Sequence, residues 1–410
     1  MQYSCFARAD LSKLYQRLSS PKISSGFDAP DSLLFIVMSN NPILIISGEQ
    51  SGETYAGLLV RELQRINPAL KFYGTGGERM KEAGVELLHH INQMAVVGIS
   101  EVVRKYRTLR GIFTDVVNSI PNHSPQLAVL VDYPGFNLKL AAVLKERGIP
   151  VVWFMAPQVW AWKESRVKQM RRVIDTLVVG FKFEVEYFQK HGIAANYFGH
   201  PLVDLLTTLE SQKRAALPNS IPTIAYLPGS RKGEIARHWP LVREVAALLG
   251  ERFRHVVQRA PSIPPDLLLG NGANIEILSQ PHSALMQADV ALVKSGTSTM
   301  EATIFGVPYA LFYRTSAINF AIFSRLAKVR QLGIANIIAG KEIVREFLQT
   351  DATPQRLADE IRRLATDAGY RQQVAADLLQ VRNSLEAPGV HARIAEHIAS
   401  TYGLRPTTPL

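Results

Sequence analysis

Short apolar runs that alternate with longer amphipathic stretches are the feature that most restricts how this chain of 410 residues can fold. Runs rich in Val and Ile occupy residues 42–47, 127–131, 151–154 and 177–180. Apolar runs of this length without internal alternation are typical of parallel strands that are buried on both faces. Residues 54–66, which follow the first run, repeat apolar side chains at helical spacing. Strands that alternate with helices predict βαβ units and a doubly wound parallel sheet.

A second series of apolar runs follows a polar break at residues 205–222, which has no strand-like segment. The runs of this series lie at 223–227, 255–258, 290–293 and 309–313, and helical patterns begin again at residue 354. The sequence therefore predicts an α/β protein with two Rossmann-like, doubly wound domains. Ligands of such sheets bind beyond the carboxyl ends of the strands, so the cleft between two facing sheets is the expected site.

The two series also set the expected domain boundaries. Residues 1–40 mix charges, Ser and Pro without periodicity and are expected to be a disordered extension. Residues 41–205 and 206–375 are the expected N-terminal and C-terminal Rossmann-like domains. Residues 376–410 are expected to form a C-terminal helix and tail, for which packing back on the N-terminal domain is one arrangement.

Charge and cysteine content narrow the class of protein further. Lys and Arg number 46 against 35 Asp and Glu, a net charge of +11, which favours an anionic partner such as a nucleic acid, a phosphorylated substrate or an acidic membrane. Cys5 is the only cysteine, which excludes an internal disulfide and a cysteine-based zinc site. No window holds the roughly 18 uninterrupted apolar residues that a transmembrane helix needs.

Two turns made of small residues in the second series are candidate phosphate sites, because each follows an apolar run and opens a helical pattern. Glycine and serine free the backbone N–H groups, and an arginine provides a fork that suits a phosphate. Each turn taken alone is also compatible with a purely structural role. The residues concerned are Gly229, Ser230 and Arg231 in the first turn, and Ser295, Gly296 and Thr297 in the second.

The first series carries two comparable loops. Ser51 and Gly52 lie in a glycine-containing turn after the first run, where a ligand or a tight turn explains the sequence equally well. Asp132 comes directly after a buried run, where a carboxylate can act as a general base, although Asp is also a common turn residue.

Other polar and aromatic segments allow more than one interpretation. Residues 156–172 combine two tryptophans, one of them Trp160, with basic side chains, a pattern found in proteins that bind single-stranded nucleic acids. Burial of the tryptophans in the core is the commoner explanation. His200 ends the first half beside the expected cleft, where it is either a substrate contact or a hydrogen-bonded structural residue. Residues 319–331 fit either a helix on an anionic membrane or an ordinary core-facing helix.

Taken in order, these segments resemble lipid-A-disaccharide synthase, an inverting glycosyltransferase family with the GT-B fold. The matching segments are Gly48–Glu53 for the family turn GE-x-SGD, Asp132–Asn137 for D-A-P-D-F-N, Ala156–Lys163 for S-P-S-V-W-A-W-R, Gly199–Asp204 for GHPLVD, Leu227–Arg231 for LPGSR, Ser295–Thr297 for SGT before Glu301, and Tyr313–Arg314 for YR. The chain departs from these patterns at Gly135, at Glu53, at Lys163 and at Gly333–Asn336, which replaces S-L-P-N.

The resemblance implies that UDP-2,3-diacylglucosamine reacts with 2,3-diacylglucosamine 1-phosphate to give a β-1,6-linked disaccharide 1-phosphate and UDP. Asp132 would accept the proton of the acceptor 6-hydroxyl, and Glu49 and Asn336 would position the sugars. Arg231 and the two small-residue turns would stabilise the departing diphosphate, and Glu301 would hold the ribose hydroxyls. No metal or other cofactor is implied.

The resemblance also implies where the protein acts. The expected location is the cytoplasm, peripheral on the anionic inner face of the cytoplasmic membrane, with the two acylated sugars and no nucleic acid as partners. A homodimer is a candidate assembly. Two rival functions remain open at this point: another GT-B nucleotide-sugar enzyme, such as a UDP-N-acetylglucosamine 2-epimerase, and a non-catalytic basic protein that binds nucleic acids.

Overall fold

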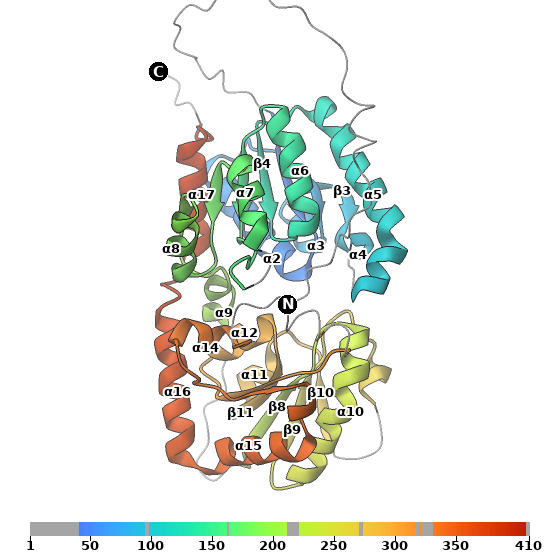
Figure 1. Ribbon diagram of the computed structural model, residues 1–410, viewed down its shortest axis with the longest axis vertical. Coiled ribbons are helices and arrows are strands. Elements are labelled where there is room, and N and C mark those ends of the chain that lie inside the picture. Colours follow the sequence, from blue (N-terminus) through green and yellow to red (C-terminus); the bar gives the residue numbers. More distant parts are fainter. Residues whose placement is uncertain are drawn as a thin grey trace, which may run out of the picture.

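Two α/β halves, each built on a parallel sheet, lie one above the other along the long axis of the molecule (Figure 1). The computed structural model describes residues 41–94, 98–161, 164–210, 221–269, 274–316, 320 and 331–406. The predicted extension at 1–40, Lys163 and most of the segment 319–331 therefore lie outside the described residues. The predicted α/β fold with two doubly wound sheets is confirmed.

The described residues of the upper half form a seven-stranded sheet in the order β3-β2-β1-β4-β5-β6-β7. Its strands are β1 (Ile43–Ser47), β2 (Phe72–Gly76), β3 (Val85–His90), β4 (Leu127–Val131), β5 (Val151–Phe154), β6 (Thr176–Val178) and β7 (Ala195–Asn196). Its helices are α2 (Gln50–Ile66), α3 (Glu78–Glu82), α4 (Ile91–Met94), α5 (Gly98–His123), α6 (Pro134–Glu146), η1 (Glu164–Arg166), α7 (Val167–Val173), α8 (Lys182–Lys190) and α9 (Leu202–Glu210).

The described residues of the lower half form a six-stranded sheet in the order β10-β9-β8-β11-β12-β13. Its strands are β8 (Thr223–Leu227), β9 (Arg254–Gln258), β10 (Ile275–Leu278), β11 (Val290–Lys294), β12 (Tyr309–Tyr313) and β13 (Glu346–Leu348). The helices that follow α9 are α10 (Lys232–Leu249), η2 (Pro265–Leu268), α11 (Ser283–Gln287), α12 (Thr297–Ile304), α14 (Ile334–Ala339), η3 (Gln349–Asp351), α15 (Pro354–Thr366), α16 (Ala368–Asn383) and α17 (Val390–Thr401).

Burial on both faces explains why the central strands are apolar without alternation. In β1, Ile43 and Ile45 join one hydrophobic cluster and Leu44 and Ile46 join another, and all four side chains are fully buried. The sheet must therefore be covered by helices on both sides, which the βαβ connections supply.

The C-terminal helices connect the two halves. α16 packs on α12, α14 and α15 of the lower half, whereas α17 lies along α2 of the upper half (Figure 1). The boundary expected at residues 375 and 376 falls inside α16, which continues to Asn383 and buries the side chains of Val374, Leu378 and Val381. The chain returns to the upper half after that residue.

Both sheets reverse their strand order at one point, and these two points locate the site. The reversal lies between β1 and β4 in the upper sheet and between β8 and β11 in the lower sheet. In open parallel sheets, ligands bind in the crevice beyond the carboxyl ends of the strands at such a point. The loops that follow these four strands are the same loops in which the sequence places the glycine turn, Asp132 and the two small-residue turns.

Candidate active site

An ion pair between Glu49 and Arg231 joins the two halves of the molecule. The Nη2 atom of Arg231 lies 3.7 Å from the Oε2 atom of Glu49. Glu49 is the N-cap residue of α2 and Arg231 is the N-cap residue of α10, so the loops after β1 and β8 meet at this point. Burial raises the pKa of the Glu49 carboxyl, and the charge of Arg231 acts against that shift. The structure thus brings together two predicted site residues from different domains.

The carboxylate of Glu234 contacts both the loop after β8 and the last residue of β11. It accepts hydrogen bonds from the backbone N–H of Ser230 (3.1 Å) and the Nη1 of Arg231 (3.4 Å), and its Oε1 lies 2.9 Å from the Nζ of Lys294. Burial opposes the ionisation of Glu234, but the charges of Lys294 and Arg231 hold its pKa at about 2. Glu234 and Lys294 are not among the site residues predicted from the sequence, although a lysine that ends an otherwise apolar run was a signal for the latter.

Two glycines make this close arrangement of the lower loops sterically feasible. Gly229 has φ +127°, and a Cβ there would lie 2.5 Å from the Oε2 of Glu234. Gly296, the N-cap residue of α12, has φ +144°, and a Cβ there would lie 3.3 Å from the Nζ of Lys294. The predicted turns at 229–231 and 295–297 therefore lie against the same buried ion pair, with the N-termini of α10 and α12 beside it.

Asp132 lies in a strained turn between β4 and α6. It has φ +46° and Tyr133 has φ +48°, two successive left-handed residues that are not glycine. Such backbone persists where surrounding contacts fix it, and it is common at functional sites. The Nδ2 of Asn137 donates a hydrogen bond to the backbone carbonyl oxygen of Asp132 (2.7 Å). The hydroxyl of Tyr133 donates one to the backbone carbonyl oxygen of Met94 (3.0 Å).

The glycine turn after β1 packs directly on this strained segment. A Cβ on Gly48 would lie 2.5 Å from the ring of Tyr133, so only glycine leaves room for that ring. A Cβ on Gly52 would lie 2.7 Å from the Oγ of Ser47. These two glycines thus serve close packing within the turn, and Ser51 lies half-buried in the first turn of α2 beside them.

Glu301 approaches the same region from the lower half. Its Oε2 lies 3.8 Å from the Nδ1 of His282. The hydroxyl of Tyr55 on α2 has its pKa raised by burial and further by the charges of both Glu301 and Asp132. The predicted ribose-binding residue and the predicted base therefore both act electrostatically on one buried ring of the upper half.

Asn336, which is expected to position a sugar, has an amide whose partners all come from the protein. Its side chain is fully buried, and its Oδ1 accepts hydrogen bonds from the backbone N–H groups of Ile343 (2.8 Å) and Val344 (3.0 Å). Its Nδ2 donates to the carbonyl of Val344 (2.8 Å) and to the Oε1 of Glu346 (2.7 Å). Both donors and both acceptor positions of the amide are thus satisfied by the protein, which makes Asn336 a structural residue.

Replacing Asn336 with Ala is expected to destabilise the protein without changing its ligand affinity. The change leaves two backbone N–H groups buried without an acceptor, which predicts a loss of about 2–4 kcal/mol in the free energy of unfolding. Denaturant titration measures this loss, with the exposed Gln355→Ala variant as the control. A stable variant with weakened nucleotide binding would restore Asn336 to the site.

Trp160 is held by a buried carboxylate. Its Nε1 donates to the Oε1 of Glu184 over 2.7 Å, and its ring packs edge-on against Phe183. Burial raises the pKa of Glu184 to about 7, against its hydrogen bonds from Trp160 and from two backbone N–H groups. Because the indole is buried and its N–H is paired, the structure favours the core packing of Trp160 over a stacking contact with a base.

His200 is also a core residue. It packs against the rings of Phe181 and Tyr55, and its Nδ1 accepts a hydrogen bond from the backbone N–H of Leu202 (3.2 Å). Burial lowers the pKa of His200 to about 3, with a smaller effect from the charge of His391, so the ring is neutral. Of the two open interpretations, the structure favours the hydrogen-bonded structural one.

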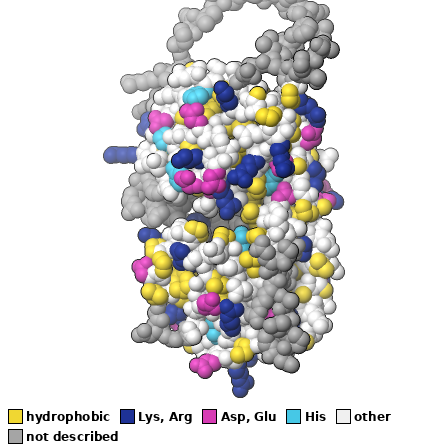
Figure 2. All heavy atoms as spheres, turned by 180° about the vertical axis from the view of Figure 1, so that it is seen from behind, with side chains coloured by type: hydrophobic (Ala, Val, Ile, Leu, Met, Phe, Trp, Pro, Cys, Tyr) yellow, Lys and Arg dark blue, Asp and Glu magenta, His cyan; other side chains and the backbone are white. Residues whose placement is uncertain are grey.

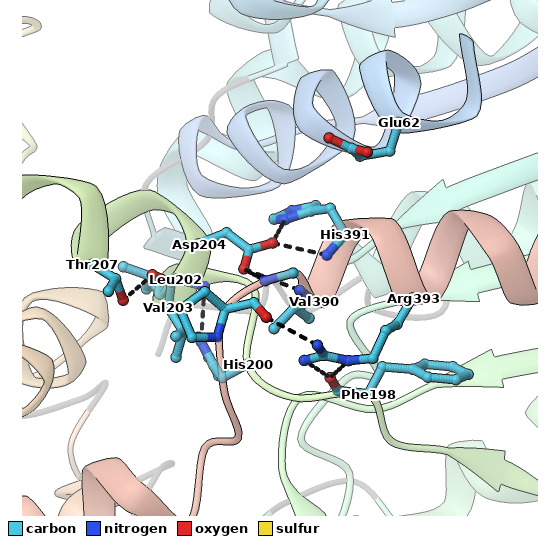
Figure 3. A network of polar contacts seen from close by, with 12 residues as sticks. Glu62, Phe198, His200, Leu202, Val203, Asp204, Thr207, Val390, His391 and Arg393 are labelled. Atoms are coloured by element: carbon cyan, nitrogen blue, oxygen red, sulfur yellow. Dashed lines mark hydrogen bonds and ion pairs between the residues drawn. The ribbon is translucent and has the colours of Figure 1, made fainter. Parts of the chain in front are cut away.

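The rest of the Gly199–Asp204 motif holds the C-terminal helix (Figure 3). Asp204 accepts hydrogen bonds from the first backbone N–H groups of α17, those of Val390 (3.0 Å) and His391 (2.8 Å), and from the Nδ1 of His391 (2.7 Å). These hydrogen bonds hold the pKa of Asp204 at about 2 although burial opposes ionisation. This motif therefore attaches α17 to the upper half.

Metal chemistry has no obvious ligand set here. In the part of the chain that the structure describes, no three side chains of His, Cys, Asp or Glu are grouped so that they could hold a metal ion.

Known proteins match both the sequence and the fold. The family model described as lipid-A-disaccharide synthetase matches residues 43–397. A lipid-A-disaccharide synthase of Geobacter sulfurreducens is 35% identical over 377 residues, which cover 89% of this chain and 98% of the relative.

Solved structures with low sequence identity share the fold. The UDP-GlcNAc 2-epimerase of Neisseria meningitidis bound to UDP-GlcNAc matches with a TM-score of 0.61 at 13% identity, over 88% of this chain and all of that one (100%). CalG4, the calicheamicin glycosyltransferase, matches with a TM-score of 0.55 at 17% identity, over 91% of this chain and 100% of its own. At these identities the likeness to the solved structures shows the two-domain fold alone. The match to the family model and the identity to the Geobacter relative show the family. The chain belongs to the lipid-A-disaccharide synthase family.

Proposed function

We propose that this chain is a glycosyltransferase that joins UDP-2,3-diacylglucosamine to 2,3-diacylglucosamine 1-phosphate and releases UDP. Its family membership supports the reaction. The observation that carries the proposal within the molecule is the Glu49–Arg231 ion pair, because it brings the glycine turn of the upper half to the phosphate-type turn of the lower half. If the two sugars bind on opposite halves, their reaction needs a site to which both halves contribute residues.

The donor binds to the lower half in this proposal. The turns at 229–231 and 295–297 present backbone N–H groups at the N-termini of α10 and α12, which favour phosphate oxygens. Arg231 adds a guanidinium fork that matches phosphate geometry. Glu301, near the same turn, accepts hydrogen bonds from the ribose hydroxyls. These groups stabilise the charge that develops on the diphosphate as it leaves.

The acceptor binds on the upper half, next to Asp132. The oxygen of its 6-hydroxyl attacks C1 of the donor sugar while the bond between C1 and the phosphate oxygen breaks. Asp132 accepts the hydroxyl proton, and the electron pair of the broken bond leaves with UDP. Because this is a single displacement, the configuration at C1 inverts, which gives the β linkage.

A direct assay tests the reaction. Purified protein is supplied with the acylated donor and assayed for UDP, with and without the acylated acceptor. UDP release that depends on the acceptor, together with a disaccharide product, supports the proposal. Conversion of UDP-N-acetylglucosamine into its 2-epimer without an acceptor would contradict the proposal and favour the activity of the epimerase that shares the fold.

Association with an anionic membrane is the second part of the proposal. No helix among the described residues is long and apolar enough to cross a bilayer. The net charge of +11 and the lipid character of both substrates favour a peripheral position on the inner membrane face. On the face that Figure 2 shows, the basic and acidic side chains of the described residues are interspersed with hydrophobic ones.

The protein is expected to sediment with vesicles that contain phosphatidylglycerol and to be partly released by salt. Raising the ionic strength from 0.1 to 1 M shortens the Debye length from about 10 Å to about 3 Å, which weakens the attraction of exposed Lys and Arg to lipid phosphates. Vesicles of phosphatidylcholine alone are the control. Equal binding to both vesicle types at every salt concentration would contradict the electrostatic part.

A further inference from the structure

Lys294 occupies an unusual position for a lysine. It is the last residue of β11, one of the two strands at the reversal point of the lower sheet, and its side chain is about nine-tenths buried, with an exposed fraction of 10%. Its Nζ lies 2.9 Å from the Oε1 of Glu234 and 5.8 Å from the centre of the Tyr313 ring. It also lies 3.3 Å from the position that a Cβ on Gly296 would take. The ammonium group therefore lies against the turn that opens α12.

A purely structural role explains this lysine poorly. Two buried charges cost several kcal/mol each to remove from water, and well-packed apolar residues in place of a buried pair are often as stable. Burial accordingly lowers the pKa of Lys294, and Glu234 opposes that shift. An arrangement that costs stability is typical of functional sites.

The charges around Lys294 balance in pairs. Lys294 and Arg231 are two cations, and Glu234 and Glu49 are two carboxylates within ion-pair distance of them. Glu234 contacts both cations, whereas Glu49 contacts Arg231 from the other half of the molecule. A diphosphate bound between the two turns would replace Glu49 as the anionic partner of Arg231. Glu234, which contacts Lys294 and Arg231, would hold both cations beside that diphosphate.

We propose that Lys294 is a further diphosphate-binding residue, whose ammonium group donates hydrogen bonds to the phosphate oxygens of the nucleotide beside Arg231, with Glu234 positioning both cations. This inference rests on the proposed function and adds a residue that lies outside the two turns predicted from the sequence. When the bond to the sugar breaks, the ammonium group also stabilises the charge on the departing phosphate.

Replacing Lys294 with Met tests this role, because Met keeps the length and packing of the side chain and removes the charge. A charge-assisted hydrogen bond to phosphate predicts that the dissociation constant for UDP rises about 10- to 100-fold. The dissociation constant for uridine, which lacks the phosphates, stays as in the wild type. Lys341→Met, at an exposed lysine of the lower half that pairs with Asp377 on α16, is the matched control and leaves both constants unchanged.

Lys294→Met leaves Glu234 with Arg231 as its remaining cation, so a change in UDP affinity could come from the unbalanced carboxylate. A second pair of variants separates this effect from the loss of a direct contact with the diphosphate. Glu234→Gln removes the buried carboxylate, and the double variant Glu234→Gln/Lys294→Met has neither charge of the pair. If Lys294 binds the diphosphate, the double variant binds UDP at least about 10-fold more weakly than Glu234→Gln alone, even where both melt at the same temperature.

The outcomes distinguish this proposal from the one on which it rests. Equal UDP affinities of the double variant and Glu234→Gln, or an unchanged affinity of Lys294→Met, would overturn the role of Lys294 alone. A wild-type protein that does not bind UDP would overturn the proposed function and this inference together.

Discussion

Replacing Asp132 with Asn is expected to lower turnover by about 100- to 10,000-fold, the range that general-base assistance supplies. A sugar hydroxyl is a weak nucleophile at neutral pH, and an amide cannot accept its proton. Asn tolerates the left-handed backbone at φ +46° as well as Asp does, so the strained turn should keep its shape. UDP affinity and melting temperature are therefore expected to stay close to those of the wild type. Steady-state kinetics, nucleotide titration and thermal melting measure the three quantities.

Two features make the Asp132→Asn variant a specific test of the base. Position 135 is Gly, so the neighbouring aspartate of the family motif is absent and cannot replace the missing base. Asp115→Asn, at an exposed carboxylate on α5 that pairs with His89, is the matched control and should leave turnover unchanged. Near-normal turnover of Asp132→Asn would remove Asp132 as the base, and a large loss of UDP affinity would make it a donor-site residue.

Replacing Arg231 with Ala is expected to weaken UDP binding about 10- to 100-fold and to lower turnover about 100- to 1,000-fold. The guanidinium contacts the diphosphate in the bound donor and again as the leaving group gains charge, so both quantities fall. Its side chain is 29% exposed and pairs with Glu49 and Glu234, so thermal melting of the variant is measured beside these two quantities. Calorimetric titration with UDP and the turnover assay check these values.

Two further variants show which property of Arg231 matters. Arg231→Lys keeps the charge but loses the planar fork, so it is expected to recover UDP affinity only in part. Arg237→Ala, at an exposed arginine on α10, removes the same charge from outside the site and should have no effect. An Arg231→Ala protein with wild-type UDP affinity would limit Arg231 to linking the two halves through Glu49.

Four of the five described strands that the sequence did not predict share a physical cause. β3 and β7 are the edges of the upper sheet, and β10 and β13 are the edges of the lower sheet. Edge strands are half-exposed, so they lack the continuous apolar run that marks a strand buried on both faces. β2 is central but contains Gly74, where a Cβ would lie 1.9 Å from the carbonyl oxygen of Ile45. Gly74 allows the close approach to β1, and the two glycines of β2 conceal the strand pattern.

The same limit applies to the site residues. Arg231, Glu49, Asp132 and Glu301 follow from motifs that are local in the sequence, and the structure places them around the strand reversals. Asn336 belongs to a motif as well, but only its four hydrogen bonds reveal that the protein itself satisfies the amide. A motif gives the identity of a residue, and the partners of its side chain come from elements that are distant in the chain.

The sequence by itself determined the two parallel sheets, the turns that open α2, α10 and α12, and the family, because burial pattern and loop composition are local properties of the chain. Only the tertiary structure decided which charges meet. Glu49 reaches Arg231, and Lys294 reaches Glu234, because strand order and crossover connections bring the carboxyl ends of distant strands together. Coulomb energy depends on distance and burial, which are both set by the folded arrangement and not by spacing along the chain.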